Sequence, residues 1–89
     1  KEEVKAAIGK ISKINEEIIK HSNNIVSKDL GNIKIIKLAR KINTMSVQNR
    51  ERLEMLPNLD GANFSAVFKE IIINLIKIEN EIKPFMKKV

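Results

Sequence analysis

Histidine is the residue type in this chain best suited to acid–base or phosphoryl chemistry near neutral pH, and it occurs once, at His21. The chain has no cysteine, tyrosine or tryptophan, and it has no HExxH, Walker or GxSxG pattern. The carboxylates stand as sequence neighbours or singly, for example Glu2/Glu3, Glu16/Glu17, Glu79 and Glu81. Adjacent residues on a helix point about 100° apart and cannot share a substrate atom. We therefore expect a protein that is not an enzyme and has no metal and no cofactor.

His21 has a structural and a chemical interpretation. In the structural one it lies at the edge of an apolar seam near the end of the first helix, where the carbonyl end of the helix dipole favours its charged form. In the chemical one it accepts a phosphoryl group. The second interpretation depends on the residues that follow His21: Ser27, Leu30, Gly31, Ile35, Leu38, Ala39 and Ile42.

This spacing resembles that of histidine phosphotransfer domains, helical bundles that carry phosphate on an exposed histidine. The resemblance covers about 22 residues and implies that His21 is the phosphoacceptor. That family usually has a lysine three residues after the histidine and a glycine at four, whereas this chain has Asn24 and Ile25 there. No cation would stand beside a phosphoryl group, and Ile25 would crowd a docking receiver domain.

A basic face is the second feature with functional meaning. No acidic residue occurs between Asp29 and Glu51, and the exposed side of the second helix is predicted to carry Lys34, Lys37, Arg40 and Lys41. Such a face would attract a phosphate backbone, an acidic lipid or an acidic protein surface. Aromatic residues do not interleave the cations, which argues against nucleic-acid readout by base stacking. A solvated lysine-rich helix face is the alternative.

A mixed apolar and basic patch is the third feature. Ile33 and Ile36 lie off the main apolar stripe of the second helix, next to Lys37 and Arg40. Exposed aliphatic side chains that cluster mark binding surfaces. We therefore treat these four residues as a candidate patch for a protein partner or for self-association.

The segment Asn63 to Lys83 is the most informative about architecture, because its apolar residues cover about 180° of a helical wheel. Phe64, Ile71 and Leu75 belong to this arc, whereas Ile73 lies opposite it. A stripe that packs on one partner would be narrower. The arc therefore predicts a helix with two neighbours, and we expect this third helix to be central.

Two further helices precede it. Residues 2–26 are predicted to form the first, with Val4, Ile11, Ile18 and Ile25 one heptad apart beside Ala7, Ile14 and His21. The second is predicted from Leu30 or Asn32 to Leu56, with Asn49 on its buried side and Ser27 or Asp29 as its cap. Pro57 should end it, Asn63 or Asp60 should cap the third helix, and Pro84 should stop or bend it. Gly9 indicates a weak point or a close helix contact.

Length and composition complete the prediction. The 89 residues are enough for one small domain, an all-α three-helix antiparallel (up-down-up) bundle with the third helix central. The start at Lys1 rather than methionine is compatible with excision from a longer chain. The absence of cysteine and of a signal-peptide pattern favours an intracellular location, and no apolar run is long enough for a membrane span.

The function that these features favour is a non-enzymatic helical protein–protein interaction module, which would act as a scaffold, an adaptor or an assembly or chaperone-like domain. A histidine phosphotransfer-like domain that uses His21 is the alternative. Nucleic-acid binding through the basic face of the second helix, on a chain of net charge +6, is a further alternative.

Overall fold

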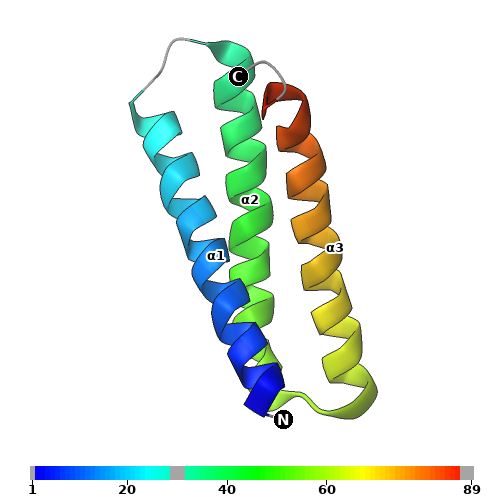
Figure 1. Cartoon of the computed structure of the whole chain (residues 1–89). Helices are drawn as coiled ribbons and strands as arrows, with labels where there is room; N and C mark the ends of the chain where they lie inside the picture. Colours follow the sequence, from blue (N-terminus) through cyan, green and yellow to red (C-terminus); the bar gives the residue numbers. More distant parts are fainter. Residues whose placement is uncertain (1, 29–31, 87–89) are drawn as a thin grey trace.

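The computed structural model describes the backbone of residues 2–28 and 32–86, and the side chains of these residues up to Pro84. Three long helices account for almost all of this part of the chain: α1 (Glu2–Ser27), α2 (Ile33–Met55) and α3 (Gly61–Met86). A single 3-10 turn, η1 (Leu56–Asn58), follows α2. The described residues contain no strand, so the predicted all-α three-helix bundle is confirmed (Figure 1).

Neighbouring helices run antiparallel. Ile8, near the start of α1, packs against the cluster that includes Leu53 at the end of α2 and Leu56 of η1. Asn43 in the middle of α2 bonds to Asn23 near the end of α1. Between α2 and α3 the same relation holds, because Arg52 late in α2 pairs with Glu70 early in α3. The chain therefore runs up, down and up along a molecule of 45 × 24 × 19 Å (Figure 1).

The helix in the middle is α2, and the prediction that the third helix is central is wrong. Backbone approach is close between α1 and α2 and between α2 and α3, whereas within the described residues α1 and α3 do not approach each other closely. Figure 1 shows α2 between the other two. The wide apolar arc of α3 was taken to mean two neighbours, but only one edge of it packs on α2. The rest of the arc lies on the side of the bundle between α1 and α3.

The cap of α2 also differs from the prediction. Asn32 precedes the helix in an extended conformation, and its side-chain oxygen accepts a hydrogen bond of 2.9 Å from the amide of Lys34. This satisfies one of the amides left without an intrahelical partner at a helix start. Ser27 instead belongs to the last turn of α1 and bonds to the Asn24 carbonyl. Asp29, with Leu30 and Gly31, lies outside the described residues.

The connection between α2 and α3 has the conformation that its proline and its glycine favour. α2 ends at Met55 and Pro57 lies in η1, as a ring without an amide hydrogen requires. α3 begins at Gly61, whose φ of 53° is a left-handed conformation that glycine adopts without strain. Asn63 is therefore inside α3, after Asp60 at its start. Pro84 does not stop α3, which continues to Met86.

The core combines a few fully buried aliphatic residues with a layer of buried polar ones. Leu56, Ile71 and Ile78 are the aliphatic residues with the least exposure. Asn15, Ser22, Ser46 and Asn49 are the buried polar residues. Asn15 donates a 2.8 Å hydrogen bond to the backbone carbonyl of Ser46, and the Asn49 side chain accepts one from Asn74 of α3. The predicted inward position of Asn49 is thus confirmed, and polar contacts join α2 to both neighbours.

Candidate functional site

An apolar groove lies between α1 and α3. Ile14 and Ile18 of α1 line one wall, and Leu75, Ile78 and Ile82 of α3 line the other, together with the exposed Glu79 of α3. We call the five apolar residues the open groove. No side chain of α2 lines this part, because α2 packs on the opposite side of both helices.

At one end the open groove leads into an apolar cavity, one side of which is formed by residues of α2. Its volume is about 350 Å³. Its lining comes from all three helices and includes Ile18, Ile25, Ile35, Leu38, Ala39, Ile42 and Ile82. Because Ile18 and Ile82 belong to both, the cavity and the open groove form one continuous apolar surface.

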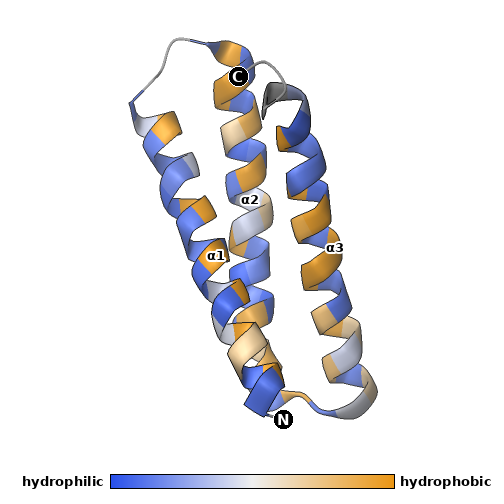
Figure 2. Cartoon of the chain, in the orientation of Figure 1, coloured by the Kyte–Doolittle hydropathy of each residue, from blue (hydrophilic) through white to orange (hydrophobic). Residues whose placement is uncertain are grey.

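The walls of the open groove extend outward over residues that solvent reaches. Ile14 is 55% exposed and Ile76 is 51% exposed. Phe68 and Ile72 are half-buried, and they lie on the same side of α3 as Leu75 because they precede it by seven and three residues. We call the open groove together with Phe68, Ile72 and Ile76 the open face. The middle turns of α3 form a nearly continuous apolar stretch in the hydropathy view (Figure 2).

A rotation of α1 explains why its apolar residues reach this side. The predicted seam placed Val4 and Ile14 inward, with His21 at its edge, but Val4 is 45% exposed, Ile14 is 55% exposed and His21 is exposed as well. The residues of α1 that are buried are Asn15, Ile19 and Ser22. Their centre is rotated by roughly 70 to 80° from the predicted seam. α1 therefore turns a polar stripe towards α2 and part of its apolar stripe towards the open groove.

His21 stands at the rim of the cavity, on the solvent side. Its side chain is 70% exposed, and its Nε2 lies 3.5 Å from a carboxylate oxygen of Glu17 one turn earlier. A carboxylate at this distance repels a phosphoryl group. The residues that resemble the phosphotransfer family begin at His21, so the resemblance does not take Glu17 into account.

The basic face has the predicted orientation on the outer side of α2. Lys34, Lys37 and Arg40 are exposed. The ammonium of Lys41 lies 2.6 Å from a carboxylate oxygen of Glu81 on α3. The sequence has no acidic residue between Asp29 and Glu51, but the folded surface has one there, because Glu81 of α3 lies beside Lys41.

The candidate patch also comes together on the outer side of α2. Ile33 is 71% exposed, Ile36 is half-buried, and Lys37 and Arg40 are exposed. Its apolar area is therefore mostly that of one side chain. The open face contains more apolar residues, and they come from two helices.

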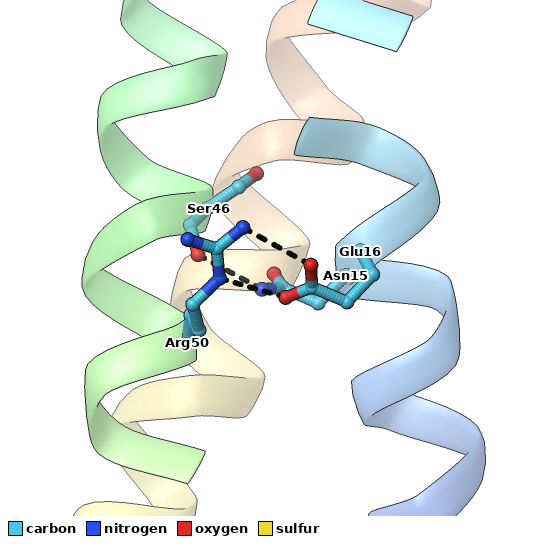
Figure 3. Close-up of polar contacts among 4 residues, drawn as sticks. All are labelled: Asn15, Glu16, Ser46 and Arg50. Atoms are coloured by element: carbon cyan, nitrogen blue, oxygen red, sulfur yellow. Dashed lines mark hydrogen bonds and ion pairs between the residues drawn. The ribbon is translucent and has the colours of Figure 1, made fainter. Parts of the chain in front are cut away.

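Polar contacts between α1 and α2 fix the position of the wall that carries Ile14. Arg50 donates hydrogen bonds of 2.8 and 3.0 Å to the two carboxylate oxygens of Glu16 (Figure 3). These hydrogen bonds are the main reason that the pKa of Glu16 is below its ordinary value, against the opposing effect of desolvation, and they raise the pKa of Arg50. Beside this pair, Asn15 donates to the Ser46 carbonyl.

The sequence prediction missed the buried residues Asn15, Ser22 and Ser46, although their spacing held a signal. Asn15 and Ser22 are one heptad apart, as are the apolar residues of the predicted seam. Ser46 precedes Asn49 by three residues, so both lie on one side of α2. A stripe of small polar residues on each of two neighbouring helices would have predicted their contact.

Two classes of site are not found in the described part of the chain. It contains no group of three or more His, Cys, Asp or Glu residues placed to hold a metal ion. None of the helices in residues 2–28 and 32–86 has the length and apolarity needed to cross a bilayer.

Comparisons with known proteins give no information about the function of this site. No protein-family model matches the chain, and neither the curated proteins nor the solved structures gave a significant match.

Proposed function

We propose that this chain is a non-enzymatic helical protein–protein interaction module whose open face binds an amphipathic helix. The observation that supports this proposal best is one apolar groove with walls from two helices, in which the 55% exposed Ile14 of α1 lies across from Leu75 and Ile78 of α3. Scattered exposed aliphatic residues are ordinary, whereas a contiguous apolar surface between two helices is typical of a binding site.

The dimensions of the groove favour a helix over an extended peptide or a small molecule. Ile14 and Ile18 are four residues apart, as are Ile78 and Ile82, so each wall presents side chains at the spacing of successive helical turns. A bound helix with apolar residues at i, i+3, i+4 and i+7 would place them between these turns. Its backbone hydrogen bonds would be internal, which suits a groove in which Glu79 is the polar residue of the lining.

A library of displayed amphipathic and scrambled peptides tests this proposal. Selection on the folded chain is expected to enrich sequences with helical apolar spacing. The enriched peptides should bind at least tenfold more weakly to an Ile14→Asp or Ile76→Asp variant, because a charge in the groove would be buried by the ligand.

The Ile33→Asp variant is the matched control, since it places the same charge at a more exposed isoleucine on α2. Peptides that bind the Ile14→Asp and Ile76→Asp variants as well as the wild-type chain, but do not bind the Ile33→Asp variant, would show that the binding site is the candidate patch. Enrichment without helical spacing would also contradict the proposal.

Phosphotransfer through His21 is the second candidate, and the exposure of the imidazole favours it. Incubation with phosphoramidate, followed by detection of acid-labile phosphate, separates the two functions. A chain that acquires phosphate, and that loses this capacity in a His21→Gln variant, would support phosphotransfer. If Glu17 repels the phosphoryl group, the wild-type chain stays unmodified while peptide binding is retained.

A further inference from the structure

The open face carries a charge pattern that specifies one partner. On α1, Glu3, Lys10 and Glu17 follow one another at heptad spacing. They run along the outer edge of the open face, next to Ala7, Ile14 and His21, which have the same spacing. All three charged residues are exposed. The signs alternate along this edge, so it does not select a partner that is acidic or basic throughout.

Alternating signs at one helix position match an antiparallel copy of the same helix. Lys10 lies four residues before Ile14, and Glu17 lies three residues after it. If a second α1 runs antiparallel with its centre at Ile14, Lys10 of each copy lies opposite Glu17 of the other to within one residue. In antiparallel helix pairs, the charged residues that flank the apolar seam on one side face their equivalents on the other helix.

The other wall of the open face is compatible with the same two-fold axis. Ile8 and Ile11 pack against the same core cluster as Phe64 and Phe68, and Ile14 and Ile18 share the open groove with Leu75 and Ile78. Ile14 is therefore about level with Ile72. Phe68 and Ile76 lie four residues before and after Ile72, so the axis brings Phe68 of one copy to Ile76 of the other.

We propose that the open face binds the open face of a second copy of this chain. The two copies are related by a two-fold axis at Ile14 and Ile72, with α1 antiparallel to α1 and α3 antiparallel to α3. The four helices then enclose Ile14, Ile18, Ile72 and Leu75 of both copies in one apolar core. This inference depends on the proposed function, since it names the helices that the interaction module binds.

Sedimentation equilibrium of the 89-residue chain tests this arrangement. A mass of twice 10.2 kDa is expected at micromolar concentration. Lys10→Glu alone and Glu17→Lys alone each turn two attractive contacts into repulsive ones and should weaken association roughly tenfold. The double variant Lys10→Glu/Glu17→Lys restores both contacts and should regain the affinity of the wild-type chain.

Ile14→Asp should give a monomer of unchanged helix content, whereas Ile33→Asp should leave the dimer intact. Single variants that weaken association without recovery in the double variant would overturn the antiparallel arrangement. If the wild-type chain is still monomeric at a concentration of about 200 µM, at which even a weak transient complex would form, a second copy is not the partner. If such a monomer still selects helical peptides through Ile14 and Ile76, the proposed function holds; if it selects none, both proposals are wrong.

Discussion

At the scale of single residues, the bundle depends on polar contacts inside a small apolar core. Asn15 and Ser46 are both 0% exposed and are joined by the hydrogen bond to the Ser46 carbonyl. The Asn15 Oδ1 and Ser46 Oγ atoms are buried without a hydrogen-bonding partner among the described residues. A buried polar group without a partner lowers stability. The layer therefore does more to set the alignment of α1 on α2 than to raise the free energy of unfolding.

Glu16 should make stability depend on pH in the acid range. Its pKa is lowered in the folded chain, chiefly by the hydrogen bonds from Arg50. Folding is therefore favoured by the charged carboxylate above its unfolded pKa of about 4.3. This contribution is lost as the pH falls through the lower, folded pKa. Urea unfolding from pH 7 to pH 3 should show that the stability difference between wild type and Glu16→Gln becomes smaller as the pH falls.

Glu51→Gln is the control for this experiment, because Glu51 is an exposed carboxylate on the outer side of α2. Its difference from wild type should stay nearly constant over the same range. If the Glu16→Gln difference grew as the pH fell, the ion pair would not have the effect described.

At the scale of elements, α3 shows how one helix divides its isoleucines between core and solvent. Ile71 is 0% exposed, whereas Ile73 is 41% exposed. Ile71→Ala should lower the free energy of unfolding by about 2 to 5 kcal/mol, through lost burial and the cavity left behind. Ile73→Ala makes the same chemical change on the same helix and should cost less than about 1 kcal/mol.

Chemical denaturation of both variants measures these differences. Equal losses would mean that the side of α3 packed on α2 has been assigned incorrectly. A loss of less than about 0.5 kcal/mol for Ile71→Ala, well below the cost of a core deletion, would contradict its complete burial.

Two glycines should respond in opposite directions to the same substitution. Gly9 lies inside α1, and an added Cβ there would meet nothing within 4 Å. Its predicted close helix contact is therefore wrong, and Gly9→Ala should stabilise the chain by about 1 kcal/mol. Gly61 has equal space but a φ of 53°, so Gly61→Ala should cost about 1 to 2 kcal/mol. Melting curves of the two variants should shift to opposite sides of wild type.

The sequence was sufficient to predict the number of helices and most of their limits, because Pro57, Gly61 and long apolar periodicity act locally. It was not sufficient to predict which helix is central. The width of the apolar arc around Ile71 shows how much surface needs cover, but not whether α1, α2 or another chain covers it. The open groove was missed for the same reason, since Ile14 was assigned to the apolar seam of the first helix.

At the scale of the whole molecule, stability should be highest in α2. It is the helix that packs on both others, whereas α3 has close backbone contact with α2 and η1 only. Protection from hydrogen exchange follows such differences in local packing. The slowest amides should lie in the middle of α2, around Ile42 to Leu53.

Hydrogen exchange measured on the Ile14→Asp variant compares the helices within one chain, because this variant is expected to be a monomer. Amides around Ile71 should exchange faster than those around Ser46. The reverse order would restore the idea of a central third helix and would contradict the arrangement described above.

The odd number of helices places the first turn of α1 and the last turn of α3 at opposite ends of a molecule 45 Å long (Figure 1). A pulling force applied at these two points is therefore directed along the helix axes. It loads the contacts of α2 with both neighbours in shear, so that the Glu16–Arg50 and Lys41–Glu81 pairs resist together. The fold is thus built to carry tension along its length better than a peeling force applied at one end.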